Sequence, residues 1–274
     1  MDQLLRAGAD VRLADLDTRA TPGFDGDKAA GEAALAAGAD ELSALQEKLF
    51  AASRAGDERR ILLVLQAMDT AGKGGILRHV VGAVDPQGVA LAAFKKPTPE
   101  ELAEHFLARI ERRLPGPGMI GVFDRSHYED VLIARVRELA PADEIERRYG
   151  EIRDFERRLV DDGTRVIKVM LHISPDEQKE RLQERLDRAD KHWKYNPGDV
   201  DERMLWPKYM EAYERAIAET DADHAPWFVV PADRKWFARL AVQHLLLREL
   251  RALDPQWPAA DFDVELEKER LAAS

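Results

Sequence analysis

The feature that most constrains the fold is an apolar run at residues 61–67 (ILLVLQA), followed at once by the glycine-rich stretch 68–75 (MDTAGKGG). A continuous apolar run of this length is typical of a central parallel strand that is covered on both faces. A glycine-rich turn between such a strand and a helix lets backbone N–H groups approach an anion. The two stretches together predict an α/β domain with a phosphate-binding loop.

Residues 67–73 (AMDTAGK) follow the spacing G-x-x-x-x-G-K of that loop, with two departures. An alanine takes the place of the first glycine, and a glycine follows the lysine where Ser or Thr usually stands. The glycines keep the backbone accessible, and the lysine adds a positive charge. The predicted phosphate contacts of the loop are Gly72, Lys73, Gly74 and Gly75.

The loop also carries a carboxylate, Asp69, which would repel phosphates unless a divalent cation lay between them. Mg²⁺ prefers hard oxygen ligands and commonly bridges carboxylates and phosphates. A second apolar run (MIGVFD) ends in Asp124, the pattern of a Walker B strand. In P-loop kinases this strand lies beside the first one, so we expect Asp124 near Asp69 and Lys73, where both acids can hold one metal ion. Arg125 can bind a phosphate through its guanidinium. The alternatives are that Asp69 caps the next helix, and that Ser126 and Glu129 form a capping box.

Strand and helix patterns alternate along the rest of the chain. Helix patterns lie between the strands, and two of them have clear caps, at Thr98 and at Ser174. Because strands that alternate with helices form parallel sheets with right-handed crossovers, we expect a three-layer αβα sandwich of the P-loop kinase type. The expected strands are 61–67, 88–94, 118–124, 166–174 and 226–232, and the expected helices include 27–53, 98–114 and 234–250.

The chain divides by pattern into three parts. Residues 1–55 are expected to be an arm and a helix packed on the core, 56–254 the kinase domain, and 255–274 an acidic tail. Two charged helical segments interrupt the alternation, at about 141–162 and 180–217, and we expect them to form a lid over the carboxyl ends of the strands.

Basic residues of the lid and of the strand ends are candidate phosphate contacts. Arg181 and Arg185 lie four residues apart on one helical face, and arginines of this kind stabilise the charge of a transferring phosphoryl group. A solvated helix with internal ion pairs explains them as well, since acids alternate with them. Lys95, Lys96 and Lys194 are candidate contacts for a long anion.

The overall charge restricts the partners. The formal net charge of the 274 residues is −11, so binding to nucleic acid or to an anionic membrane is not expected. The absence of cysteine excludes disulfides and thiolate metal sites. No basic region followed by an apolar stretch opens the chain, and we expect a cytoplasmic protein.

Several stretches together resemble the second family of polyphosphate kinases over about residues 25–250: QAMDTAGKGG, FDRSHYEDVL, KHWKYNPGDVDERMLWPKYMEAYERAI and APWFVVPADRKWFARL. The resemblance implies reversible transfer of the terminal phosphoryl group of inorganic polyphosphate to a nucleoside mono- or diphosphate, a purine nucleotide above all, with Mg²⁺ or Mn²⁺. It implies that Asp69 and Asp124 hold the metal, that Lys73 and Arg125 contact phosphates, and that Arg181 and Arg185 complete the site. The resemblance also implies a homo-oligomer, the usual state of proteins in this family.

Two other functions fit parts of the same pattern. An ATP-dependent nucleoside monophosphate kinase would share the loop, the Asp-Arg pair and the lid, and only the resemblance separates it from a polyphosphate enzyme. A non-catalytic binding module would not need all of Asp69, Lys73, Asp124 and Arg125. Glu129 lies where subgroups of the family differ, and its neighbourhood is similar to the branch that accepts monophosphates as well as diphosphates.

Overall fold

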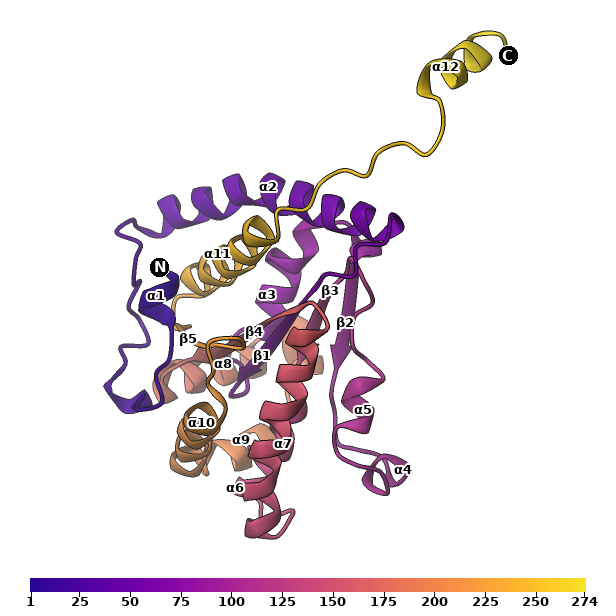
Figure 1. The fold of residues 1–274 in the computed structure, drawn as a ribbon. Coiled ribbons are helices and arrows are strands. Elements are labelled where there is room, and N and C mark those ends of the chain that lie inside the picture. The colour runs from indigo at the N-terminus through magenta and orange to yellow at the C-terminus, as the bar shows by residue number, and fades with distance from the viewer.

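The structure is a computed structural model that describes residues 1–274. Its centre is a parallel sheet in the order β2-β3-β1-β4-β5 (Figure 1). The third strand lies beside the first, as expected for a Walker B strand. The strands are β1 (Arg60–Ala67), β2 (Val89–Ala93), β3 (Ile120–Asp124), β4 (Thr164–His172) and β5 (Trp227–Pro231).

Helices cover both faces of this sheet. Successive side chains of a strand point to opposite faces, and in the central strands the side chains on both faces are apolar and must be buried. In β1, Leu63 and Leu65 belong to the apolar cluster under the helices α2, α3 and α11. Leu62 and Val64 belong to the cluster under α7 and α10. The expected three-layer αβα sandwich is confirmed. The covering helices are α2 (Lys28–Arg54), α3 (Lys73–His79), α11 (Lys235–Leu253), α7 (Ala142–Asp161) and α10 (Trp206–Thr220).

The remaining helices gather mainly at the carboxyl ends of the strands, on the side where α6, α9 and α10 are seen in Figure 1. Among them, α8 begins directly after β4 and is capped by Ser174, as predicted. They are α6 (Ile133–Val136), α8 (Pro175–Asp187), a 3-10 helix (Ala189–Lys194) and α9 (Gly198–Arg203). Shorter 3-10 turns are Leu13–Asp15, Val81–Ala83, Pro86–Gly88 and His127–Asp130.

Two sequence expectations need correction. Neither expected lid segment is simply a lid. Ile152, Phe155 and Leu159 of α7, in 141–162, are buried in the sheet-covering cluster, and so are Ala212 and Ile217 of α10, in 180–217. The single helix expected at 98–114 is two separate turns, α4 (Pro99–Leu102) and α5 (Ala108–Glu111). The predicted capping box at Thr98 is present, but the His105 ring accepts from the Leu107 amide and pairs with Glu151 of α7, which competes with helix continuation.

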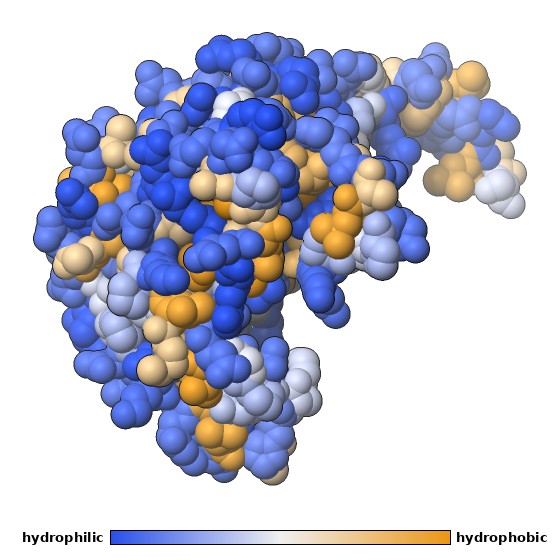
Figure 2. Space-filling view, turned by 90° about the horizontal axis from the view of Figure 1, so that it is seen from below, coloured by the Kyte–Doolittle hydropathy of each residue, from blue (hydrophilic) through white to orange (hydrophobic).

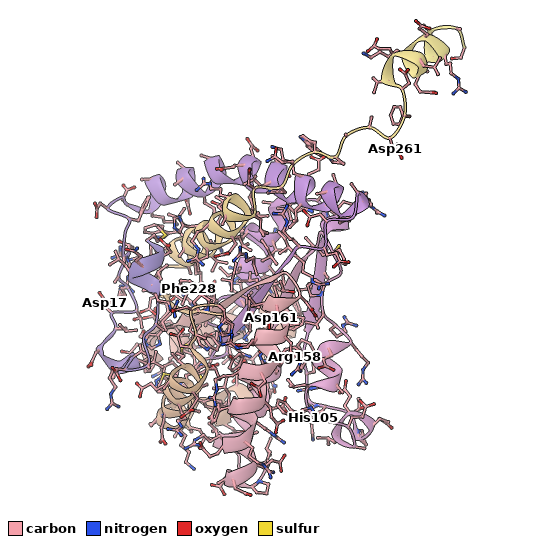
Figure 3. The ribbon with its side chains drawn as sticks, in the orientation of Figure 1. Asp17, His105, Arg158, Asp161, Phe228 and Asp261 are labelled. Atoms are coloured by element: carbon pink, nitrogen blue, oxygen red, sulfur yellow. The ribbon has the colours of Figure 1, made fainter.

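The two ends of the chain differ in how they pack against the body of the protein. Near the N-terminus, α1 (Asp2–Leu5) and the residues after it pack on the sheet edge, where the Ala7 amide donates to the Trp227 carbonyl of β5. At the C-terminus, α12 (Val264–Ala272) stands away from the body at the end of an extended segment, which passes Asp261 (Figures 1 and 3). None of the helices is long and apolar enough to cross a membrane. The three-part division of the chain stays a prediction.

Candidate active site

The phosphate loop connects β1 to α3 in a backbone conformation suited to anions. Gly72 has φ +120°, which side chains rarely permit, and Thr70 adopts the left-handed conformation at φ +65°. A Cβ added at Gly74 would meet no atom within 4 Å, so that side of the loop is open. The amides of Gly72, Lys73 and Gly74 donate to no acceptor within the protein. The loop therefore presents a row of unpaired N–H groups to an incoming anion.

The two predicted metal-binding acids lie at neighbouring strand ends. Asp124 is the last residue of β3 and is in register with Leu65 of β1, while Asp69 follows two residues after β1 ends. Each acid faces a cation. Arg125 donates to Asp69 at 3.2 Å, and the Lys73 ammonium lies 3.9 Å from Asp124.

These acids fit a magnesium site in their chemistry. Both offer hard carboxylate oxygens, and both are about a quarter exposed, at 27% for Asp69 and 29% for Asp124. No group of three or more potential metal-binding side chains occurs in the protein. An ion held here would complete its shell with water and substrate oxygens, as Mg²⁺ commonly does beside phosphates.

A small hollow of about 60 Å³ opens next to the loop. Asp69, Arg125 and Glu129 line it from the sheet side, and the lid contributes Tyr209 and Tyr213 from α10. Glu129 thus points into the site, while Ser126 alone caps the following turn by accepting from the Tyr128 amide. The capping alternative therefore explains Ser126 and not Glu129. The sequence analysis did not identify Tyr209 and Tyr213 as residues of the site.

The charges of the hollow shift one another's ionisation. Desolvation raises the pKa of Glu129 even though Arg125 and Lys73 oppose the shift. Burial alone would lower the pKa of Arg125, but Glu129 and Asp69 outweigh it and raise that pKa. Arg125 therefore stays positively charged, and it lies between Asp69 of the loop and Glu129 in the hollow.

Arg181 does not reach into the site, contrary to the sequence expectation. It is 5% exposed, and its guanidinium is fully used inside the protein. It donates to the backbone carbonyls of Thr70 and Ala71 in the loop and of Ala232 and Asp233 after β5, and also to Glu177. A phosphate contact by Arg181 would require the loss of these bonds.

The other predicted cations are dispersed. Arg185 pairs with Asp199 at 3.2 Å and donates to the Lys194 carbonyl, so it holds lid segments together. The exposed Lys194 side chain lies over the Trp193 ring. Lys95 and Lys96 follow β2 and line a separate basic hollow of about 550 Å³, together with Arg109, Arg112 and Arg113.

A further cation beside the loop, Arg239 of α11, was not predicted from any motif. A Cβ added at Gly75 would lie 3.5 Å from the Arg239 guanidinium of α11. Partial desolvation, together with Arg239 and Arg78, lowers the pKa of His79 on α3. Arg239 is far from the loop in sequence, so only the packing of α11 on α3 brings it there.

Comparisons with known proteins show what the chain is similar to. The family profile for "Polyphosphate kinase 2 (PPK2)" matches residues 25–258. An AMP/ADP-polyphosphate phosphotransferase of Meiothermus ruber is 46% identical over 90% of this chain and 91% of its own. An ADP-polyphosphate phosphotransferase of Rhodopseudomonas palustris is 42% identical over 80% of this chain and 78% of its own. The crystal structure of polyphosphate kinase 2 from Arthrobacter aurescens superposes with a TM-score of 0.97 at 57% identity, covering 99% of this chain and 96% of that one.

Proposed function

The chain belongs to the polyphosphate kinase 2 family and is a phosphotransferase with polyphosphate as its phosphoryl donor, and we propose that it accepts both nucleoside mono- and diphosphates. The observation that carries the proposal is the placement of Asp69 and Asp124 on neighbouring strand ends beside the open phosphate loop. The acceptance of both AMP and ADP is supported by the printed name of the Meiothermus ruber relative and by Glu129 in the hollow.

In this proposal Asp69 and Asp124 hold Mg²⁺, which Mn²⁺ can replace. The ion supplies charge neutralisation and orientation to the phosphates when it is bound. Lys73 and Arg125 each pair with one of these acids in the ligand-free protein, and they turn to phosphate oxygens when the acids are engaged. An acid–cation pair at each strand end therefore exchanges partners on substrate binding.

We place the two substrates on opposite sides of the loop. The donor chain lies along Arg239, which is beside Gly75, and along its neighbour Arg78. The acceptor lies at the mouth of the hollow, beside Arg125 and Glu129.

The transfer itself needs no base in the site. An acceptor phosphate oxygen attacks the terminal phosphorus of polyphosphate, the bridging P–O bond breaks, and the shortened chain leaves with the bond's electron pair. The attacking oxygen is already anionic, so positioning and electrostatic stabilisation carry the reaction. The free amides of Gly72 and Lys73 are the donors that would stabilise the transferring group.

The direct test supplies polyphosphate and AMP or ADP with Mg²⁺ and no ATP, and separates the nucleotides by chromatography. Formation of ADP from AMP and of ATP from ADP is the expected result. An ATP-dependent monophosphate kinase would form neither product, and a binding module would retain polyphosphate without turnover. Product from ADP alone would contradict the proposed monophosphate activity.

The remaining expectations are carried here as proposals. The protein is cytoplasmic and binds neither nucleic acid nor membrane. It is also a homo-oligomer, and the C-terminal arm, residues 255–274, offers a surface for this. Trp257 and Phe262 on the arm are more than half exposed, at 54% and 59%, as are Leu266 and Leu271 of α12, at 51% and 77%. Figure 2 shows the arm's hydrophobic side chains away from the body. The match to a solved relative extends over 99% of this chain, so it takes in most of this detached arm, and a second copy would cover it.

A further inference from the structure

Three consecutive carbonyl groups of the phosphate loop are held by one helix. The Gln178 amide donates to the Asp69 carbonyl at 3.1 Å, and Arg181 donates to the carbonyls of Thr70 and Ala71 at 3.0 and 2.9 Å. Both side chains come from the first two turns of α8 and are buried, with 1% and 5% exposure. A helix outside the loop thus fixes the orientation of its peptide groups.

This orientation decides where the loop's N–H groups point. In a trans peptide the N–H points away from the carbonyl of the same peptide unit. Because the carbonyls of Asp69, Thr70 and Ala71 face α8, the amides that follow them face away from it. Of these amides, Ala71 bonds within the loop at 3.3 Å, while those of Thr70 and Gly72 have no acceptor in the protein.

Gln178 also contacts the lid. Its carbonyl oxygen accepts from the Arg203 guanidinium at 3.0 Å, at the end of α9. One buried side chain therefore bridges a lid residue and the backbone of the acid that is proposed to hold the metal. One helical turn after Arg181, Arg185 ties α8 to Asp199 of α9.

We propose that Gln178 and Arg181 are positioning residues that hold the phosphate loop in its anion-binding conformation, and that Gln178 couples this conformation to the lid through Arg203. Neither residue touches substrate, because every polar atom of both side chains is already used inside the protein. The role rests on the proposed phosphoryl transfer, in which the loop amides stabilise the transferring group.

The first test is hydrogen exchange of the loop in ligand-free protein. Gln178→Met keeps the size of the side chain and removes both bonds. Gln183→Met is the matched control, because Gln183 is exposed on the same helix and bonds only to Asp187. We expect the hydrogen-bonded loop amides, those of Ala71, Gly75 and Ile76, to exchange roughly tenfold faster in Gln178→Met, and at the wild-type rate in the control. Unchanged loop exchange in Gln178→Met, or equal acceleration in both variants, would overturn the proposal.

The second test separates turnover from binding. In Gln178→Met, kcat should fall by roughly tenfold to a hundredfold while the KM for polyphosphate stays within about threefold. Arg181→Lys keeps the charge but cannot span carbonyls from two segments, and it should show the same pattern. If Arg181 contacted phosphate instead, the lysine would preserve most of the turnover and mainly raise KM. Fast loop exchange with unchanged kcat would also refute the role.

Arg203→Met provides a variant at a half-buried position, where the fold depends less on the side chain. Alone it should accelerate loop exchange in the same direction as Gln178→Met. On the Gln178→Met background it should add only the small effect of its second bond, to the Pro175 carbonyl. Additive effects would show that Gln178 does not link the lid to the loop. If the wild-type protein showed no polyphosphate transfer, the proposed function would be wrong. The exchange comparison would still test whether Gln178 holds the loop in its conformation.

Discussion

Replacement of the buried Lys168 by methionine should destabilise the protein strongly. Lys168 of β4 is 0% exposed, and its ammonium lies 2.6 Å from Glu156 of α7, which is 2% exposed. The same ammonium donates to the Thr220 carbonyl and to the Tyr128 hydroxyl. His127 contacts Glu156 as well, so the network anchors the segment that follows Arg125 in the active site.

The magnitude follows from this burial. Removal of one partner of a buried ion pair leaves an uncompensated charge and costs about 3–5 kcal/mol. For a domain of this size each kcal/mol corresponds to roughly 2–4 °C, so Tm should fall by roughly 6–20 °C. Burial alone would raise the pKa of Glu156, but Lys168 outweighs it and the pKa is lowered. The stability from this carboxylate is therefore present above its ordinary pKa of 4.5 and is lost as the pH falls through the lowered value.

The assay is thermal and urea unfolding followed by tryptophan fluorescence. Arg251→Met is the control, because Arg251 and Glu41 lie equally close, at 2.6 Å, but are 52% and 44% exposed. That exposed pair should contribute less than about 1 kcal/mol. The deficit of Lys168→Met should shrink as the pH falls below 4.5, where Glu156 becomes protonated in the unfolded chain. A loss below about 1 kcal/mol at neutral pH would refute the argument that this buried pair is strongly coupled.

Four further outcomes are expected. Asp69→Asn should lose nearly all Mg²⁺-dependent turnover with an unchanged Tm, and near-normal activity would contradict the metal role. Arg185→Ala should lower kcat more than polyphosphate binding, because Arg185 joins lid segments; equal loss of both would indicate direct ground-state binding. The pKa of Glu129 is raised, so its contribution to stability falls as the pH rises from 4.5 through the raised value, and the stability advantage of Glu129→Gln should grow across that window in unfolding titrations. Truncation after Asp254 should lower the molar mass in light scattering to that of a smaller assembly, and an unchanged oligomer would exclude the arm as its contact.

The fold was largely readable from the sequence, because the strand signal is strong where both faces are buried. All five strands were predicted, and β3 was expected beside β1 from the Walker B pattern alone. The wrong predictions concern segments whose structure depends on tertiary contacts. The helix expected at 98–114 is interrupted by contacts of His105, and the burial of Phe155 on β4 makes α7 a covering helix.

The site residues could be predicted where they lie together in a short sequence motif. Asp69, Lys73 and Arg125 lie in contiguous motifs, and the structure brings them together with Asp124. The role of Arg181 was not readable, because helical spacing does not reveal whether an arginine faces solvent or the backbone of a distant loop. Arg239 was missed for a similar reason, since its contact with the loop depends on the packing of α11.

The acidic protein can bind a polyanion because its charges act over different distances. The net charge is −11, yet at 0.1 M ionic strength charges more than about 10 Å apart are largely screened. Arg78 and Arg239 have no ion-pair partner within 4.0 Å, whereas many other cations are paired on the surface, such as Arg251 with Glu41. The potential at the loop therefore depends on the charges close to it. These are the cations Lys73, Arg125 and Arg239 with the free amides on one side, and Asp69, Asp124 and Glu129 on the other. Higher salt should then weaken polyphosphate binding, as expected for local attraction, even though it also screens the long-range repulsion.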